Sequence, residues 1–314
     1  MDIIHLPFEL WTLIFDLLDI KVQVRLIQLC KTIKDNIFVT DLCNIYKKLK
    51  RKLNRDIIKK YPYIKKLDAS NDCIVIKCSS ICGIEDEDLI GLNLIELDAS
   101  YNPKIKKINH MANLRILNAS WNCGIEDDGL IGLNLVELNA YNNPKIKKIN
   151  HMTNLRILNA GGYYCGIDDD SLVGLNLVEL NTWYNPKIKK INHMTNLRIL
   201  DAMSSISGID DDSLVGLNLV ELNASANPKI RKINHMTNLR ILNAAGFCGI
   251  GDDDLIGLNL VKLDARYNQK IKKINHMTNL RKLNAEGDCG IGDEDLIGLN
   301  LVELYTYNNP KIKK

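Results

Sequence analysis

One pattern repeats through most of this sequence, from residue 64 to the last residue. The string Gly-Leu-Asn-Leu recurs every 41 or 42 residues, and its copies start at Gly91, Gly132, Gly174, Gly216, Gly257 and Gly298. Each period has two unlike halves, which share the frame Leu-x-x-Leu-x-Ala-x-x-Asn with isoleucine at the twelfth place. A unit of 20 to 22 residues cannot bury its apolar face alone, so neighbouring units must stack. The sequence therefore predicts a solenoid of about twelve short units over residues 64–314.

The frame also predicts the direction of each side chain. The first, fourth and sixth positions are apolar and point inward from a short strand, while positions three, five and seven face the other side. Asparagine at the ninth position can hydrogen-bond the backbone of the turn that follows. The fifth position is almost always Asn or Asp, which indicates a structural ladder.

This frame resembles the leucine-rich repeat, and the half that reads Cys-Gly-Ile-x-Asp-Asp-x-Leu resembles its cysteine-containing subclass. The resemblance implies an α/β solenoid with parallel strands stacked along a concave face. The last unit stops after 14 residues, so we expect an uncapped edge strand that meets a partner or marks a truncated gene.

Residues 1–45 do not follow the repeat and have apolar residues at helical spacing. The run L6-P7-F8-E9-L10-x3-I14-F15-x2-L18, followed by L29-C30-K31, resembles an F-box. That resemblance implies a small three-helix module that binds the adaptor of an SCF-type (cullin-RING) ubiquitin ligase. The residues it places at or near the adaptor are Leu6, Pro7, Glu9, Ile14, Leu18 and Leu26. The alternative is a helical cap that only seals the first repeat.

Residues 46–63 are predicted to form a basic helical linker between the 1–45 module and the 64–314 solenoid. Residues 44–63 hold eight basic residues and one acidic residue, which indicates a solvated lysine face or, less simply, a nuclear signal. The combination of an F-box with such repeats resembles protein families expanded in large DNA viruses of protists. We therefore expect an intracellular, cytoplasmic protein, in the host cytoplasm if it is viral.

The units are nearly identical, so the positions at which they differ indicate where recognition occurs. Positions seven and eight vary freely, and several copies carry the aromatic residues that often anchor protein interfaces. We predict a partner-binding edge built from Tyr101, Trp121, Tyr141, Trp183, Tyr184 and Tyr267. The alternative is neutral drift at unconstrained surface positions.

The charges argue against a nucleic-acid binder. The 314 residues include 41 Lys or Arg and 38 Asp or Glu, and residues 64–314 hold 29 basic and 31 acidic residues. Acidic and basic clusters alternate between half-repeats, which predicts a charge ladder along one flank; a nucleic-acid stripe or a calcium site is the alternative. No stretch is long and apolar enough to span a membrane.

The repeated cysteines and histidines fit the same geometry. Copies two units apart lie about 10 Å apart, too far for a disulfide, so Cys82, Cys123, Cys165, Cys248 and Cys289 are predicted to be reduced, packed thiols. A metal site at Cys73, Cys78 and Cys82 is the alternative for that cluster. The histidine of each Ile-Asn-His-Met string is predicted to be a surface residue.

No catalytic motif or cofactor site is recognisable, so we expect a protein that is not an enzyme and has no cofactor or metal. The predicted function is a substrate-recognition subunit of an SCF-type ubiquitin ligase, with an adaptor at the F-box and an unknown target protein at the repeats. The alternative is a leucine-rich-repeat interaction scaffold without a ligase link. A nucleic-acid binder led by the basic linker is a third class.

Overall fold

The computed structural model describes residues 55–59, 61, 63–71 and 83–313, together with residues 14, 17, 18, 22, 23 and 25. The chain divides into two compact units, Met1–Asn139 and Ala140–Lys314. This division falls inside the repeats. The boundaries predicted at residues 45 and 63 stay predictions.

A three-residue strand follows each predicted unit start by two residues. The first compact unit contains β1 (Lys66–Asp68), β2 (Glu96–Asp98), β3 (Ile116–Asn118) and β4 (Glu137–Asn139). The second contains β5 (Ile157–Asn159), β6 (Glu179–Asn181), β7 (Ile199–Asp201), β8 (Glu221–Asn223), β9 (Ile241–Asn243), β10 (Lys262–Asp264), β11 (Lys282–Asn284) and β12 (Glu303–Tyr305). Within each unit, consecutive strands pair in parallel. The predicted parallel solenoid is confirmed.

The pairing register places each position of the frame beside its own copies. Leu222, for example, lies opposite Leu200 on one side and Leu242 on the other. The first, fourth and sixth positions are buried in every half-repeat except the last, as Leu219, Leu222 and Ala224 illustrate, whereas Leu304 of the last is 42% exposed. Isoleucines and methionines from the later part of each unit complete this core. The inward direction predicted for these side chains is therefore confirmed.

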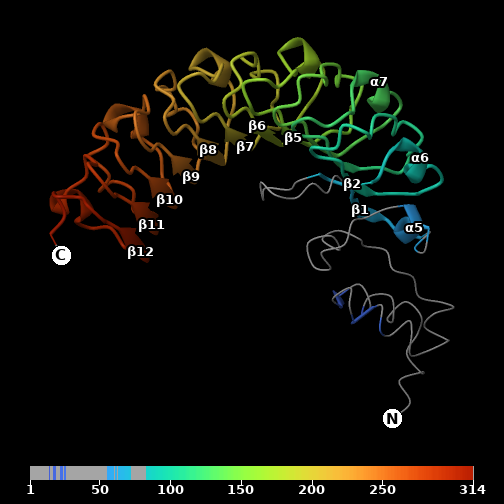
Figure 1. Ribbon diagram of the computed structural model, residues 1–314. Helices are drawn as coiled ribbons and strands as arrows, with labels where there is room; N and C mark the ends of the chain where they lie inside the picture. Colours follow the sequence, from blue (N-terminus) through green and yellow to red (C-terminus); the bar gives the residue numbers. More distant parts are fainter. Residues whose placement is uncertain are drawn as a thin grey trace. The chain divides into compact units, whose positions relative to one another are not determined.

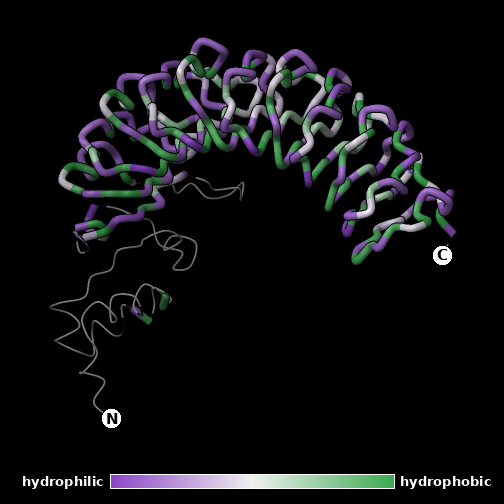
Figure 2. The backbone as a smooth tube through the Cα atoms, turned by 180° about the vertical axis from the view of Figure 1, so that it is seen from behind, coloured by the Kyte–Doolittle hydropathy of each residue, from purple (hydrophilic) through white to green (hydrophobic). Residues whose placement is uncertain are grey.

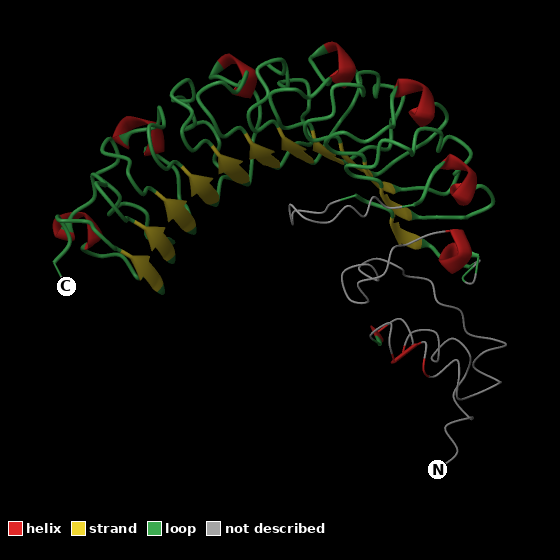
Figure 3. Cartoon of the chain, in the orientation of Figure 1, coloured by secondary structure: helices red, strands yellow, loops and turns green. Residues whose placement is uncertain are grey.

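Short helical turns occur opposite the strands in the cysteine-type half-repeats. They are α6 (Asp86–Leu89) and α7 (Asp127–Leu130) in the first unit, and the 3-10 turns η2 (Asp170–Leu172), η3 (Asp212–Leu214), η4 (Asp252–Leu255) and η5 (Asp293–Leu296) in the second. A further short helix, α5 (Arg55–Ile58), precedes β1. In the second unit the strands line the inner side of a curved stack and the 3-10 turns lie on its outer side (Figures 1 and 3). The outer loops there are largely hydrophilic (Figure 2).

The ninth-position asparagine joins one half-repeat to the one before it. Asn227 is completely buried, and its Nδ2 donates to the carbonyls of Ala202 at 3.0 Å and Ile209 at 3.1 Å. Its Oδ1 accepts from the amide of Lys229 at 3.0 Å. The bond to the following turn was predicted, whereas the two bonds to the previous half-repeat were not. The same three bonds occur at Asn102, Asn185, Asn268 and Asn309.

The repeated thiols are packed inside the solenoid. Cys123, Cys165, Cys248 and Cys289 are buried and are not joined in disulfides, as predicted. Burial raises the pKa of Cys165 and of Cys248 to about 11, so both thiols are protonated near neutral pH. Cys73, Cys78 and Cys82 lie outside the described residues. Among the helices of the described part, none is long and apolar enough to cross a lipid bilayer.

Candidate interaction surface

The predicted adaptor-binding residues fall largely outside the part of the chain that the structure describes. Leu6, Pro7, Glu9 and Leu26 are not described. Ile14 is in helical conformation with 39% of its surface exposed, and Leu18 lies half-buried at a bend. The three-helix module therefore stays a prediction.

The charged flank is held together by carboxylate-to-amide hydrogen bonds. Oδ1 of Asp169 accepts from the backbone amides of Lys189 at 2.7 Å and Lys190 at 2.8 Å. Asp86, Asp211 and Asp252 bond the amides of the next basic cluster in the same way. One ion pair of the kind that we predicted joins Lys104 to Glu85 at 3.6 Å. The acidic and basic rungs alternate, but these Asp carboxylates fix the repeat order by binding backbone.

The repeated histidines have a structural contact on the same flank. Nε2 of His193 lies 3.3 Å from the carbonyl oxygen of Leu172, and Nε2 of His235 lies 3.2 Å from that of Leu214. Both rings are exposed, as predicted. Each ring thus links the Ile-Asn-His-Met turn to the helical turn of the preceding half-repeat.

A hollow of about 830 Å³ lies on the flank of the first unit, between residues 86–93 and 107–113. Two of its titratable side chains, those of Asp86 and His110, make structural contacts. Oδ1 of Asp86 accepts two backbone amides, and Nε2 of His110 lies 3.2 Å from the carbonyl oxygen of Leu89. Within the described ranges, no three His, Cys, Asp or Glu side chains are grouped so that they could hold a metal ion.

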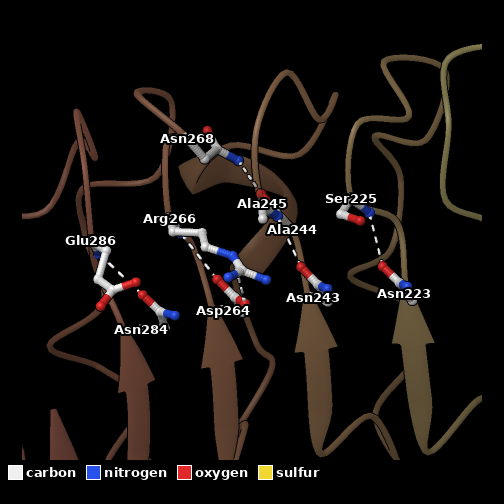
Figure 4. Close-up of polar contacts among 10 residues, drawn as sticks. All are labelled: Asn223, Ser225, Asn243, Ala244, Ala245, Asp264, Arg266, Asn268, Asn284 and Glu286. Atoms are coloured by element: carbon white, nitrogen blue, oxygen red, sulfur yellow. Dashed lines mark hydrogen bonds and ion pairs between the residues drawn. The ribbon is translucent and has the colours of Figure 1, made fainter. Parts of the chain in front are cut away.

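The fifth-position Asn or Asp ends the strand by bonding its own turn. Oδ1 of Asn223 accepts from the amide of Ser225 at 3.2 Å, and Oδ1 of Asp264 accepts from that of Arg266 at 3.2 Å. Figure 4 shows this contact after four neighbouring strands, β8 to β11. The predicted structural role is therefore confirmed, and the contact that these four copies share lies within each turn. Asn118 adds a cross-strand bond, from its Nδ2 to Oδ2 of Asp98 at 3.1 Å.

The turn that follows places the eighth residue in the left-handed region. From the second half-repeat to the last, φ at this position lies between 53° and 104°, and the residues are Tyr101, Trp121, Asn142, Gly162, Tyr184, Ser204, Ala226, Gly246, Tyr267, Gly287 and Asn308. Glycine adopts this conformation without strain, and asparagine tolerates it. Other side chains there cost about 1 kcal/mol. Four of the six predicted partner-binding residues occupy this position.

The predicted partner-binding aromatics form separate groups. In the first unit, the rings of Tyr101 and Trp121 stack, with centroids 5.2 Å apart. In the second, Tyr141 stacks on Trp183 at 5.8 Å, and Trp183 meets the edge of Tyr184 at 5.2 Å. Tyr267 is 60% exposed and belongs to neither group.

Sequence reasoning missed several exposed apolar residues at the same strand ends. Tyr163 and Tyr164 directly follow Gly162, and their rings meet edge to face at 5.3 Å. Ile206 and Phe247 follow the eighth residue after β7 and β9, and both are exposed. A signal was present, because the half-repeats that hold Tyr163 and Ile206 are one residue longer than the cysteine-type copies that start at Leu114, Leu239 and Leu280.

The inner strand face of the second unit changes charge along its length. Glu179, Asp201 and Glu221 line a hollow of about 200 Å³ across β6 to β8. Burial raises the pKa of Asp201 above its ordinary value, against the lowering effect of the Met203 amide bond and the Asn223 side chain. Farther along, Lys262 and Lys282 line a second hollow across β10 to β12.

Comparison with known proteins places the fold but no family. No model of a protein family matches the chain, and no curated protein does. The solved TLR13–ssRNA13 complex has a TM-score of 0.50 at 17% identity, covering 81% of this chain and 48% of TLR13. Internalin C2 from Listeria monocytogenes has a TM-score of 0.44 at 26% identity, covering 57% of this chain and 82% of its own. The functional domain of InlJ from the same organism has a TM-score of 0.49 at 21% identity, covering 79% and 54%.

This chain therefore spans about half the length of the TLR13 and InlJ chains. Within each unit, the described repeats form a parallel β-solenoid of the leucine-rich-repeat type, in agreement with the TLR13 structure.

Proposed function

We propose that this chain is a substrate-recognition subunit of an SCF-type (cullin-RING) ubiquitin ligase. The observation that carries the proposal is the sequence pattern Leu6-Pro7-x-Glu9-Leu10 with Leu29-Cys30-Lys31, placed ahead of a leucine-rich-repeat solenoid. The N-terminal segment holds the ligase adaptor and the solenoid holds the target. The chain then positions proteins for ubiquitylation in the cytoplasm and does not itself catalyse a reaction.

The surface of the solenoid supports the target-binding part of this proposal. A nearly invariant scaffold presents variable aromatic residues at one end of its strands, including Trp121, Trp183 and Tyr184. Trp121 and Tyr184 are 37% and 43% exposed. Large exposed aromatic side chains are frequent anchors of protein interfaces. A scaffold that repeats with little change and carries variable aromatic residues is suited to recognition of a partner.

An adaptor pull-down tests the ligase link. Tagged wild-type chain is expected to recover the cullin adaptor from stoichiometric mixtures, and the Leu6→Ala/Pro7→Ala double variant is expected to lose it. Trp183→Ala is the matched control, because it changes the solenoid and leaves the N-terminal pattern intact, so adaptor recovery should equal that of wild type. Wild type that recovers no adaptor would refute the ligase link and leave the interaction scaffold without a ligase.

A further inference from the structure

Apolar side chains of the second unit gather just beyond the carboxyl ends of strands β4 to β7. We call Tyr141, Tyr163, Tyr164, Trp183, Tyr184 and Ile206 the edge cluster. Tyr141 and Trp183 are half-buried, and the other four are exposed. Tyr163 and Tyr164 are 57% and 68% exposed. Exposed apolar groups of this kind mark interaction sites more often than inert surface.

Two glycines between the rings show that the edge cluster is a packed feature. Gly161 belongs to the half-repeat that lies between the half-repeats of Tyr141 and Trp183. A Cβ atom on Gly161 would come within 3.1 Å of the Tyr141 ring and 3.0 Å of the Trp183 carbonyl oxygen. The missing side chain therefore leaves the space in which rings from alternate half-repeats stack. Gly162 supplies the left-handed turn at the same place.

The edge cluster also costs free energy that the fold does not require. Tyr184 has φ of 58°, a left-handed backbone angle that is strained for any residue with a Cβ atom. Nε1 of Trp183 is buried and has no hydrogen-bond partner among the described residues. Ala245 and Gly246 fill the same two positions in a later half-repeat without either cost. Strain kept where the scaffold does not need it indicates a role in binding.

Charge on the adjoining strand face determines which partner fits. Across β5 to β9, the side chains at positions three and five include three carboxylates, Glu179, Asp201 and Glu221, and no cation. The arginines at position two direct Nη1 toward backbone oxygens of their own loops, at 2.9 to 3.0 Å. This region is therefore acidic, with Ile199 as an apolar floor between the two glutamates.

We propose that the edge cluster and these carboxylates form a docking surface for an arginine-rich segment of a partner protein. A guanidinium stacks on the exposed aromatic faces and pairs with carboxylates in a fixed geometry. Its aliphatic stem lies along Ile199. The proposal deepens the target-binding part of the proposed function and does not depend on the adaptor.

The far end of the same face limits where the basic segment lies. Lys262, Arg266 and Lys282 line the strand face over β10 and β11. Lys282 pairs with Glu303 at 2.6 Å, and Arg266 pairs with Asp264 at 3.2 Å. Glu303 and Asp264 are thus already paired with cations of this chain, so they attract a guanidinium less than Glu179 and Glu221 do. The basic part of the partner therefore lies over β5 to β9.

Fluorescence anisotropy with the full-length chain tests this proposal. The probe is a labelled synthetic peptide of alternating arginine and glycine, and a glutamate–glycine peptide is the charge-reversed control. Wild type is expected to bind only the arginine peptide. The Glu179→Gln/Glu221→Gln variant should weaken binding about tenfold, and Tyr184→Gly should weaken it severalfold without loss of thermal stability.

The matched control removes two carboxylates from the outer flank, in Asp170→Asn/Asp212→Asn. Both residues are exposed in the 3-10 turns of the same unit. This variant should bind within about twofold of wild type, because the lost charges lie away from the strand face. Equal weakening in the two double variants, no binding by wild type, or tighter binding of single-stranded polyuridine would overturn the proposal. Because no adaptor is present in the assay, its failure is distinguishable from failure of the ligase link.

Discussion

At the eighth residue of each half-repeat from the second onward, the fold requires a positive φ but does not require a particular side chain. At Tyr267 φ is 57°, and its amide donates to the carbonyl of Glu286 at 3.0 Å, which extends the parallel ladder into the turn. Gly246 and Gly287 adopt the same sign of φ in neighbouring turns. The turn therefore requires the angle and not the tyrosine.

The positive φ at Tyr267 predicts that a glycine variant is more stable there than an alanine variant. Tyr267→Gly should be more stable than Tyr267→Ala by about 1 kcal/mol, because alanine keeps the left-handed strain and glycine removes it. Urea unfolding of the two variants measures the difference. Tyr305, exposed within β12, is the control, and there glycine should be the less stable of the two. The same order at both positions would contradict the assignment of strain.

The positive φ at the eighth position could have been predicted from the sequence. The eighth column contains Asn142, Gly162, Gly246 and Gly287, and such residues are typical of left-handed turns. Comparison of the eighth residues of all half-repeats could therefore have predicted a positive φ for Tyr184 as well. The stacking of Tyr141 on Trp183 could not be predicted, because it depends on how closely alternate half-repeats approach over Gly161.

At the scale of the element, strand positions and the buried face followed from the period of the frame. Strand β8 begins and ends at the third and fifth positions, as the other strands do. The chemistry between units was harder to predict. Lys232 and Asp211 are oppositely charged and suggest an ion pair, yet Oδ1 of Asp211 accepts the backbone amide of Lys232 at 2.8 Å. The sequence shows the charge of each residue and its position in the half-repeat. It does not show whether a carboxylate will meet the side chain or the backbone amide of the residue in the next half-repeat.

The buried asparagine is the main polar link between half-repeats, and its removal should be costly. Asn227→Ala leaves the carbonyls of Ala202 and Ile209 and the amide of Lys229 without their partner. We expect a loss of about 3 kcal/mol in the free energy of unfolding. Each buried polar group left without a partner costs roughly 1–3 kcal/mol, and partial relaxation of the three groups reduces their sum to about this total. Denaturant unfolding measures it. Exposed Asn238→Ala should change stability by less than about 0.5 kcal/mol, and equal losses would contradict the role of Asn227.

At the scale of the whole molecule, the second unit is a stack in which each strand pairs only with the strands on either side of it. β7 pairs with β6 and β8, and β11 pairs with β10 and β12. Stability in such a stack is close to a sum of local terms. Damage in one half-repeat should therefore spread to its neighbours and fade along the stack.

Gly208 is a suitable place to test this locality. Its Cβ would collide with the carbonyl oxygen of Ile188 in the preceding half-repeat, so Gly208→Ala must displace backbone. Hydrogen exchange followed by mass spectrometry should show faster exchange in β6 to β8 and unchanged exchange in β11. Gly216→Ala is the control, because Gly216 has φ of 81° and open space around its Cβ position. This variant should lose about 1 kcal/mol in the free energy of unfolding from left-handed backbone strain, without a clash. Faster exchange spread evenly from β5 to β12 in Gly208→Ala would mean that the unit opens as one cooperative block and that neighbour pairing does not limit the damage.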